Sequence, residues 1–372
     1  MHTSSLAARL TRAVAVIGLT VATACAPDAP SVVAPPPTDA NLIAVGRPDD
    51  LGPARAAQVR HTGRLLGNRD VLGTGIGRLS DGRPGITVYA RNTAAAARLP
   101  RELDGIPVVA EVTGDITVLP AVARVKPQPK PDRPPGGGGG GGGGGTIKPT
   151  DYARPAYIGM STGNAGECAS GTIGAKISKG GTIYALSNNH VFARENDGAS
   201  GETIYQPGRY DLGCASGAQY AWGTLSTYRN ISFGGSNTAD AALARVTNAA
   251  NLVGSTPPGV SYGSPSATLA NASLNMAVQK FGRTTGHTTG VIVGVNVTIR
   301  VQYSSGVATF VNQIQIRGDK GAFSKSGDSG SLIVTRTGNH PVGLLFAGGQ
   351  TSTFANTIQD ALQAVGGGTI VP

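Results

Sequence analysis

The chain has 372 residues, a formal net charge of +10 and only 14% charged residues. Its 56 glycines and 5% aromatic residues favour a mainly β, extracytoplasmic protein over a helical cytosolic one. The basic residues are scattered and form no block, so the charge does not indicate a nucleic-acid partner. No apolar stretch reaches the roughly 18–20 residues that cross a bilayer as a helix.

The first residues have the pattern of a bacterial lipoprotein precursor. Two arginines precede the apolar run Ala13–Ala22, and small residues stand directly before Cys25. This arrangement resembles a lipobox, which implies a signal peptide over residues 1–24 and lipidation of Cys25. Residues 25–40, rich in Ala and Pro, are expected to form a disordered tether. The protein would then be extracytoplasmic and anchored by lipid to a bacterial membrane, in the periplasm or at the cell surface. Ordinary secretion is the alternative.

Cysteine usage agrees with export. With Cys25 lipidated, Cys168 and Cys214 remain as an even pair in an oxidising compartment. We therefore expect a disulfide between these two cysteines.

Residues 41–125 are expected to form a small α+β module. No cluster of His, Cys or carboxylate residues marks the module as catalytic. In placement and α+β character it resembles the pro-region of secreted bacterial proteases, and it would then assist folding or block a cleft until it is removed. Its expected helices and strands are Pro53–Leu66, Val71–Leu79, Gly85–Ala90, Thr93–Leu99, Ile106–Val112 and Ile116–Leu119, in the order αββαββ.

A linker over residues 126–150 follows the module. It alternates proline with charge and then runs through ten consecutive glycines, Gly136–Gly145. Glycine at this density loses too much entropy on ordering to form a fixed structure, so a domain boundary is expected here.

Residues 151–372 contain many short apolar runs separated by Gly, Ser and Asn turns. This pattern predicts an all-β sandwich or barrel. The one strong helix signal is Thr357–Val365, where Ile358, Leu362 and Val365 share a face. The expected strands are Gly171–Lys176, Thr182–Ser187, Ala221–Tyr228, Ala241–Val246, Ala277–Phe281, Gly290–Val301, Gly306–Ile316, Ser331–Arg336 and Val342–Ala347.

The stretch Gly327-Asp328-Ser329-Gly330 is the first candidate for chemistry. Glycines on both sides permit tight backbone geometry and leave the Ser329 hydroxyl uncovered, which suits a nucleophile. Gly, Asp and Ser also form ordinary surface turns, so the stretch alone does not decide between the two.

Two further residues support the nucleophile. His190 follows an expected strand in Ser187-Asn188-Asn189-His190, and Asp240 opens the apolar strand Ala241–Val246. A base must reach both solvent and nucleophile, and an acid that orients it is usually buried. Each residue alone is more often a packing or turn residue, but they occur in the order His, Asp, Ser.

With this order, the segments SNNHV, TADAALA and SGDSGSLIV resemble the three catalytic motifs of the bacterial trypsin-like serine proteases, which have the chymotrypsin fold. SNNHV is similar to the HtrA branch, and Lys280–Gly286 with the following Gly-Val-Ile is similar to the streptogrisin and α-lytic branch. The resemblance covers about residues 165–365. It implies a double β-barrel with a C-terminal helix.

The resemblance also implies roles for individual residues. Ser329 would be the nucleophile, His190 the general base and then acid, and Asp240 the residue that orients His190. The N–H groups of Gly327 and Ser329 would form the oxyanion hole. Asp328 would hold the loop from inside the domain.

Several positions depart from the family pattern. Ser331 stands where a second glycine is common, and no cysteine follows His190. Phe323 stands at the base of the expected substrate pocket, where it cannot select Lys or Arg. An apolar or small residue is one expected preference; an acidic residue, reached by Ser324, Arg283 and His287, is another. The pocket wall would come from Phe346, Ala347 and Gly348.

The leading function is therefore an extracytoplasmic serine endopeptidase that acts on proteins or peptides. A catalytically inactive protease-fold binding module at the cell surface is the alternative, and an esterase that uses the same residues is a third. Five His and three Cys do not approach zinc spacing, and no phosphate-binding loop is present, so no metal or cofactor is expected.

Overall fold

The structure is a computed structural model that describes residues 51–119, 121–122 and 147–372. The expected signal peptide, the expected tether, Cys25 and most of the glycine-rich linker lie outside the described residues. None of the described helices is long and apolar enough to cross a bilayer.

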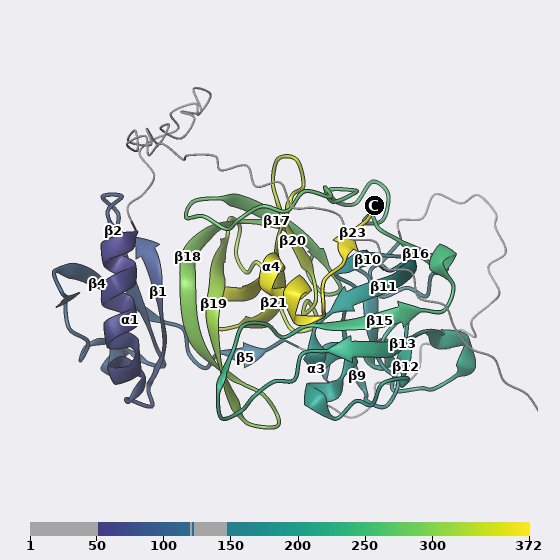
Figure 1. The fold of residues 1–372 in the computed structure, drawn as a ribbon, viewed down its shortest axis with the longest axis horizontal. Coiled ribbons are helices and arrows are strands. Elements are labelled where there is room, and N and C mark those ends of the chain that lie inside the picture. Colours follow the sequence, from purple (N-terminus) through teal and green to yellow (C-terminus); the bar gives the residue numbers. More distant parts are fainter. Residues whose placement is uncertain (1–50, 120, 123–146) are drawn as a thin grey trace, which may run out of the picture. The chain divides into compact units, whose positions relative to one another are not determined.

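The first barrel is a closed ring of antiparallel strands, drawn in teal in Figure 1. Around the ring, β8 is followed by β9 and β10, and then by β11, β15, β13 and β12, which pairs again with β8. The ring closes because β9 and β10 follow each other along the chain, one pairing with β8 and the other with β11. Between them, the Gly174 N–H donates to Leu186 O of β11 at 2.8 Å. Buried Trp222 and Phe192 belong to its core. The strands are β8 (Ser161–Asn164), β9 (Ala169–Thr172), β10 (Ala175–Lys179), β11 (Thr182–Ser187), β12 (Thr203–Tyr205), β13 (Ala221–Tyr228) and β15 (Ala242–Val246).

The second barrel, green to yellow in Figure 1, closes in the same way. Its order is β17, β18, β19, β22, β21 and β20, and β20 pairs back to β17, with every pairing antiparallel. Along β18, buried residues alternate with partly exposed ones over much of its length, as the period of two in a strand requires, whereas β21 is buried at every position. The strands are β17 (Ala277–Gly282), β18 (Gly286–Gln302), β19 (Val307–Gly318), β20 (Leu332–Thr335), β21 (Pro341–Gly348) and β22 (Thr353–Thr357).

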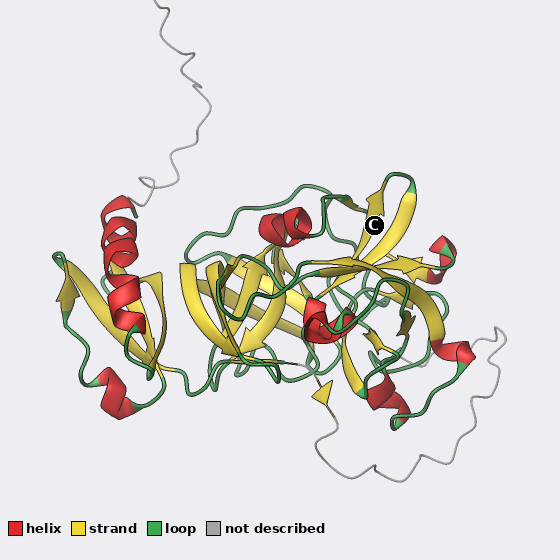
Figure 2. Ribbon diagram, turned by 60° about the horizontal axis from the view of Figure 1, so that its bottom comes forward, coloured by secondary structure: helices red, strands yellow, loops and turns green. Residues whose placement is uncertain are grey.

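The two barrels share an apolar cluster. Leu186 and Leu243 from the first barrel join Leu332 and Leu344 from the second, and the C-terminal helix α4 (Ile358–Ala364) packs on the same cluster. Thr357 caps α4 by accepting the N–H of Asp360 at 3.2 Å. Figure 2 shows that strands predominate and that helices are short and few beside them. Because both barrels bury apolar surface here, their docking is part of the core.

The N-terminal module is an α+β unit whose sheet continues into the second barrel. Its strands run in the order β1, β2, β4 and β3, and β1 pairs antiparallel with β18 of the barrel. Ala57 and Leu65 of α1 pack on this sheet. The elements are α1 (Gly52–Leu66), β1 (Val71–Arg78), β2 (Pro84–Ala90), α2 (Thr93–Ala96), β3 (Glu102–Leu103) and β4 (Ile106–Val112).

The last expected strand of the module, Ile116–Leu119, does not join the module's own sheet. Its central residues form β5 (Thr117–Val118), which pairs with β18 and β21 of the second barrel. The next strand, β6 (Ala121–Val122), pairs with β9 of the first barrel. The sequence pattern also missed β3, β8, β12 and β22, and four further short strands: β7 (Ala156–Tyr157), β14 (Ser236–Asn237), β16 (Leu252–Val253) and β23 (Thr369–Ile370).

The predicted fold class is confirmed. The described chain is mainly β, with a double barrel, a C-terminal helix and a preceding α+β module. The expected disulfide is also present, because Cys168 and Cys214 are bonded with their Cα atoms 5.1 Å apart.

Candidate active site

The loop that carries Ser329 depends on two glycines with positive φ. Gly327 has φ +98° and Gly330 has φ +92°, in the region that residues with a Cβ rarely adopt. At Gly330 a Cβ would also collide with Thr172 O of β9. The loop therefore takes a tight path that only glycine permits at these two positions.

Asp328 holds this loop from inside the domain, as the family resemblance implied. Its carboxylate accepts N–H groups from Thr284 at 2.8 Å, Thr285 at 3.1 Å and Lys325 at 2.9 Å. Ser331, which departs from the family's glycine, donates its hydroxyl to Asp328 O at 2.6 Å. The departure therefore adds a hydrogen bond inside the loop.

Lys280 is a buried partner of Asp328 that sequence reasoning missed. Its side chain is fully buried, its Nζ lies 3.6 Å from Asp328 Oδ2, and it donates to Gly286 O at 2.9 Å and to Thr285 Oγ1. Burial lowers the pKa of Lys280 to about 8, and the charge of Asp328 opposes part of this shift. The ammonium thus offsets the buried carboxylate under the Ser329 loop.

His190 and Asp240 meet at the edge of the first barrel. His190 lies in the short helix α3 (Asn189–Phe192), and its Nδ1 is 2.6 Å from Asp240 Oδ2, with both side chains almost fully buried. A carboxylate can only accept, so Nδ1 carries the proton and Nε2 is left as a base. His190 Nε2 is buried and has no hydrogen-bond partner in the described part of the chain. Asn188 positions the pair by donating to Asp240 O at 2.7 Å.

Tyr303 is a second residue that sequence reasoning missed. Its hydroxyl donates to Asp240 Oδ2 at 2.8 Å, and its ring lies edge-on to the His190 ring, with centroids 6.1 Å apart. Burial raises the pKa of Tyr303 well above its ordinary value, and the Asp240 charge acts in the same direction, so the hydroxyl stays protonated. Tyr303 directly follows β18, and no motif marks it.

Other buried polar groups of the second barrel hold the backbone around Asp240. The Asp240 N–H donates to Asn356 Oδ1 at 3.1 Å, and Asn356 Nδ2 donates to Gln313 Oε1 at 2.6 Å. Gln313 in turn donates to Thr238 O at 2.9 Å. Asp240 belongs to the first barrel, so its position depends on the docking of the second.

The structure brings the Ser329 loop against the His190 segment. Ser329 O accepts the Thr172 N–H of β9 at 2.8 Å. A Cβ on neighbouring Gly171 would meet Val191 Cγ2 at 2.5 Å and Ser329 O at 3.1 Å, so both segments lie against this glycine. The Ser329 hydroxyl donates to Phe346 O at 3.2 Å.

Gly327 has its N–H directed at a carbonyl oxygen. It donates to Leu119 O at 2.5 Å. A backbone N–H next to a candidate nucleophile, aimed at a peptide carbonyl, is the arrangement that stabilises an oxyanion during acyl transfer.

The residues expected to line the substrate pocket contribute in different ways. Phe323 is buried in an apolar cluster that also contains Leu119. Ala347 and Gly348 pair with β5 along the edge of β21. The ring of Phe346 packs in another cluster, with its centroid 4.8 Å from that of Phe310, so Phe346 offers its carbonyl to the site.

The residues suggested for acidic specificity have other partners. Arg283 binds Asp211 through two nitrogens, with Nε 3.1 Å from Oδ2. His287 Nε2 lies 2.9 Å from Gln279 Oε1; burial lowers the pKa of His287, and the charges of Lys280 and Arg336 add to this effect. Ser324 bonds to Thr353 at 2.6 Å. The geometry therefore gives no support to an acidic preference.

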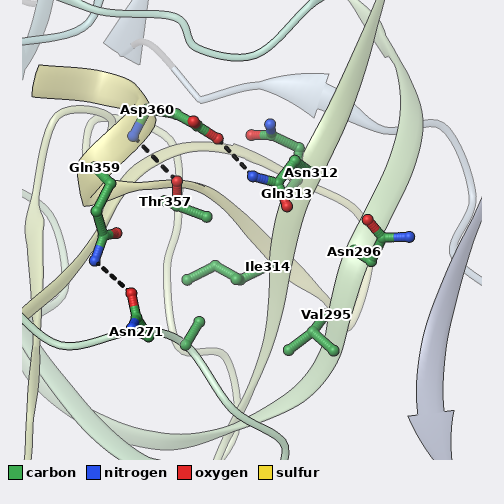
Figure 3. Close-up of a pocket in the computed structure, with 10 residues that line it drawn as sticks. Asn271, Val295, Asn296, Asn312, Gln313, Ile314, Thr357, Gln359 and Asp360 are labelled. Carbon is green, nitrogen blue, oxygen red and sulfur yellow. Dashed lines mark hydrogen bonds between the residues drawn. The ribbon is translucent and has the colours of Figure 1, made fainter. Parts of the chain in front are cut away.

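A separate pocket of about 230 Å³ lies where α4 faces β18 and β19 (Figure 3). Hydrogen bonds of 2.7 Å between Asn312 and Asp360 and of 3.1 Å between Gln359 and Asn271 cross its rim. None of the three candidate catalytic residues lines it. In the described ranges, no group of three or more His, Cys, Asp or Glu is placed to hold a metal ion.

Comparisons with known proteins give the following results. No protein-family model matches the chain, and no curated protein matches it. Among solved structures, it is similar to a glutamic-acid-specific serine protease (23% identity, TM-score 0.43, 58% of this chain and 100% of that one). It is also similar to Protease A of Thermobifida fusca, with 20% identity and a TM-score of 0.41 over 58% of this chain and 100% of that one. A third similar structure is an alpha-lytic protease homologue, N4, with 23% identity and a TM-score of 0.40 over 57% of this chain and 98% of that one. These structures are of the family that the three motifs indicated.

We predict that Tyr303→Phe lowers the rate of reaction at Ser329 by about 10-fold or more, because a hydrogen bond to a charged group contributes roughly 1.5–3 kcal/mol. The change leaves the aromatic packing in place. The measurement is kcat on a small acyl ester, and KM should stay nearly constant. Tyr228→Phe, which removes a 3.0 Å hydrogen bond to Gly198 O, is the matched control. An equal effect of both variants would contradict a positioning role.

We predict that Lys280→Met destabilises the fold by about 3–5 kcal/mol, because it leaves the buried Asp328 charge without its cation. Native Lys280 loses its proton near pH 8, whereas the ordinary value is 10.5. Between these two pH values the unfolded wild type holds the Lys280 proton and the folded wild type does not, so the wild type gains stability as pH rises. The variant has no such group, so the free energy of unfolding of the wild type should exceed that of Lys280→Met by more at pH 10.5 than at pH 8. Urea unfolding measures it, with exposed Lys320→Met as control. A Lys280→Met curve that overlays the wild type would refute this role of Lys280.

Proposed function

We propose that the protein is a serine endopeptidase that hydrolyses peptide bonds through an acyl-enzyme intermediate. The observation that carries this proposal is the His190–Asp240 pair: Nδ1 is fixed by the carboxylate at 2.6 Å, while Nε2 is left without a partner in the described ranges. An imidazole held in this tautomer, beside a glycine-flanked serine, is suited to act as a general base.

In the proposed reaction, the Ser329 hydroxyl attacks the carbonyl carbon of the substrate and transfers its proton to His190 Nε2. The N–H groups of Gly327 and Ser329 stabilise the oxyanion, and each donor contributes about 3–4 kcal/mol to the transition state. His190 then protonates the leaving amine, and the C–N bond breaks to leave an ester on Ser329. Water, activated by His190, hydrolyses this ester.

Asp240 and Tyr303 act through His190. The carboxylate keeps Nδ1 protonated and stabilises the imidazolium that forms in each step. Tyr303 and the Asn356 amide hold Asp240 in place while the charge on His190 changes. Asp328 and Lys280 keep the Gly327 N–H pointed into the site.

We predict that a fluorophosphonate probe labels the full chain at Ser329, that Ser329→Ala is not labelled, and that His190→Ala is labelled at least about 10³-fold more slowly. Because Leu119 O already contacts the Gly327 N–H, labelling is also measured in Leu119→Asp. Peptide mapping locates the label.

Three outcomes would contradict this function. Labelling that persists in Ser329→Ala would place the nucleophile elsewhere. Absence of labelling in both the wild type and Leu119→Asp would leave the inactive binding module as the better description. Turnover of small esters without cleavage of casein would indicate an esterase.

We also propose that the protein is exported and anchored to a bacterial membrane through lipid on Cys25, with protein or peptide substrates outside the cytoplasm. The lipobox-like residues before Cys25 support this location. We predict that cells fed an alkyne-tagged fatty acid label the wild type but not Cys25→Ser, and that Cys25→Ser moves from the membrane to the soluble fraction. Equal membrane association of both proteins, without tag on either, would contradict the anchor.

A further inference from the structure

The chain carries its own peptide along the edge of β21. Val118 pairs with Ala347 and Thr117 with Gly348 in antiparallel register, so β5 is an additional strand on this edge. On the other side, Thr117 pairs with Gln302 of β18, whose N–H donates to Ile116 O at 2.8 Å. Strand addition to a sheet edge is a common way for proteins to bind extended peptides.

At Leu119 this peptide reaches the reactive groups. The Leu119 N–H donates to Phe346 O at 3.3 Å, and Leu119 O accepts the Gly327 N–H at 2.5 Å. Phe346 O also accepts the Ser329 hydroxyl at 3.2 Å. Phe346 O thus accepts from both the Ser329 hydroxyl and the Leu119 N–H, while the Gly327 N–H donates to the Leu119 carbonyl oxygen.

The Leu119 side chain is enclosed by apolar groups. It is only 9% exposed and belongs to the same cluster as Phe323, Ile292 and Ile316. A Cβ on Gly348 would meet Leu119 Cδ1 at 3.1 Å, so this glycine leaves the space that the leucine fills. The Phe323 ring packs against β18, where a Cβ on Gly290 would meet it at 2.9 Å.

These surroundings select by size and charge. Leu119 shares its apolar cluster with Phe323, so an acidic or basic side chain in place of the leucine would be a buried charge among apolar groups. A smaller side chain such as alanine would leave a cavity.

We infer that Thr117–Leu119 occupies the substrate track as a substrate does, and that the enzyme cleaves peptides after leucine or an aliphatic residue of similar size. This inference rests on the proposed function and names its substrate class. The track binds three residues before the cleaved bond as a β-strand, and the Leu119 pocket supplies the selectivity.

The chain also continues past the site. Ala121 pairs with Ser170 and Val122 with Ala169, so the backbone passes from β21 of the second barrel to β9 of the first. The residue that follows Leu119 in the sequence is Pro120. Its ring nitrogen carries carbon where other residues carry hydrogen. This carbon obstructs the proton that His190 must deliver to the leaving nitrogen, so the Leu119–Pro120 bond is a poor substrate and the peptide remains bound.

The N-terminal module holds the peptide in register. Besides the β1–β18 pairing, Gln58 Nε2 donates to Asn296 O at 2.8 Å, and Tyr89 donates to Gln315 Oε1 at 2.9 Å. Close to the peptide, the Gln350 N–H donates to Thr113 O at 2.9 Å. Because the bound peptide is part of the same chain, its effective concentration at the site is high.

The test is to make this bond cleavable. In full-length Pro120→Ala, Ser329 Oγ can attack the Leu119 carbonyl, the C–N bond that follows Leu119 can break, and the amine of the substituted residue can take its proton from His190. We expect a fragment that ends at the Leu119 carboxylate, detected by mass spectrometry. The wild type, the double variant Pro120→Ala with Ser329→Ala, and the linker control Pro131→Ala should show no cut at this bond.

The substrate class is tested in Leu119→Asp, in which the charge should expel the peptide from the apolar pocket. We expect Ser329 to be labelled by the fluorophosphonate at least about 10-fold faster than in the wild type. A peptide library should be cleaved after leucine at least about 10-fold better than after alanine, and hardly after glutamate or lysine.

The outcomes separate this inference from the proposed function. The substrate assignment is wrong if Leu119→Asp is labelled at Ser329 but Pro120→Ala is not cut after residue 119. It is also wrong if the library is cleaved mainly after acidic, basic or small residues. In both cases the proposal that the protein is a protease still stands. If no variant is labelled, the protease itself is wrong.

Discussion

The buried Asp328 carboxylate is the group on which the site depends. Four hydrogen bonds from Thr284, Thr285 and Lys325, together with the Lys280 cation, hold it beneath the Ser329 loop. A buried carboxylate is stable only with such partners, so the loop cannot relax without exposing a charge that has lost them. This fixes the Gly327 N–H, and a fixed donor stabilises a developing oxyanion better than a mobile one.

The seam between the barrels supplies the other half of the site. His190 and Asp240 come from the first barrel, whereas Tyr303, which holds the Asp240 carboxylate, and Asn356, which holds its backbone, come from the second. The apolar cluster that both barrels share keeps these groups together. Docking of the barrels, rather than either barrel alone, therefore sets the orientation of His190, the candidate base.

The N-terminal module is tied to the same machinery through the sheet. Its strand β1 extends β18, and the chain that leaves the module passes along β21 to the Gly327 N–H. Sheet continuation satisfies the backbone groups of an edge that would otherwise face water. In our proposal, the second barrel thus uses β18 to pair with the module and β21 to bind the peptides that the enzyme cleaves.

Much of this structure could be predicted from the sequence because its signals are local. Alternating apolar residues predicted long strands such as Thr182–Ser187 and Ala221–Tyr228 with the bounds observed, and glycines in SGDSGS predicted the tight turn at Ser329. Short polar strands such as β8 were missed, because Ser161–Asn164 has no apolar alternation and is buried by its neighbours. Contacts between segments far apart in the sequence were decided only by the tertiary structure. Examples are the hydrogen bond from Tyr303 to Asp240, the ion pair of Lys280 with Asp328, and the hydrogen bond from Gly327 to Leu119. The physical reason is that periodicity and turn residues report on the local backbone, whereas hydrogen bonds across the barrels depend on how the sheets close and dock.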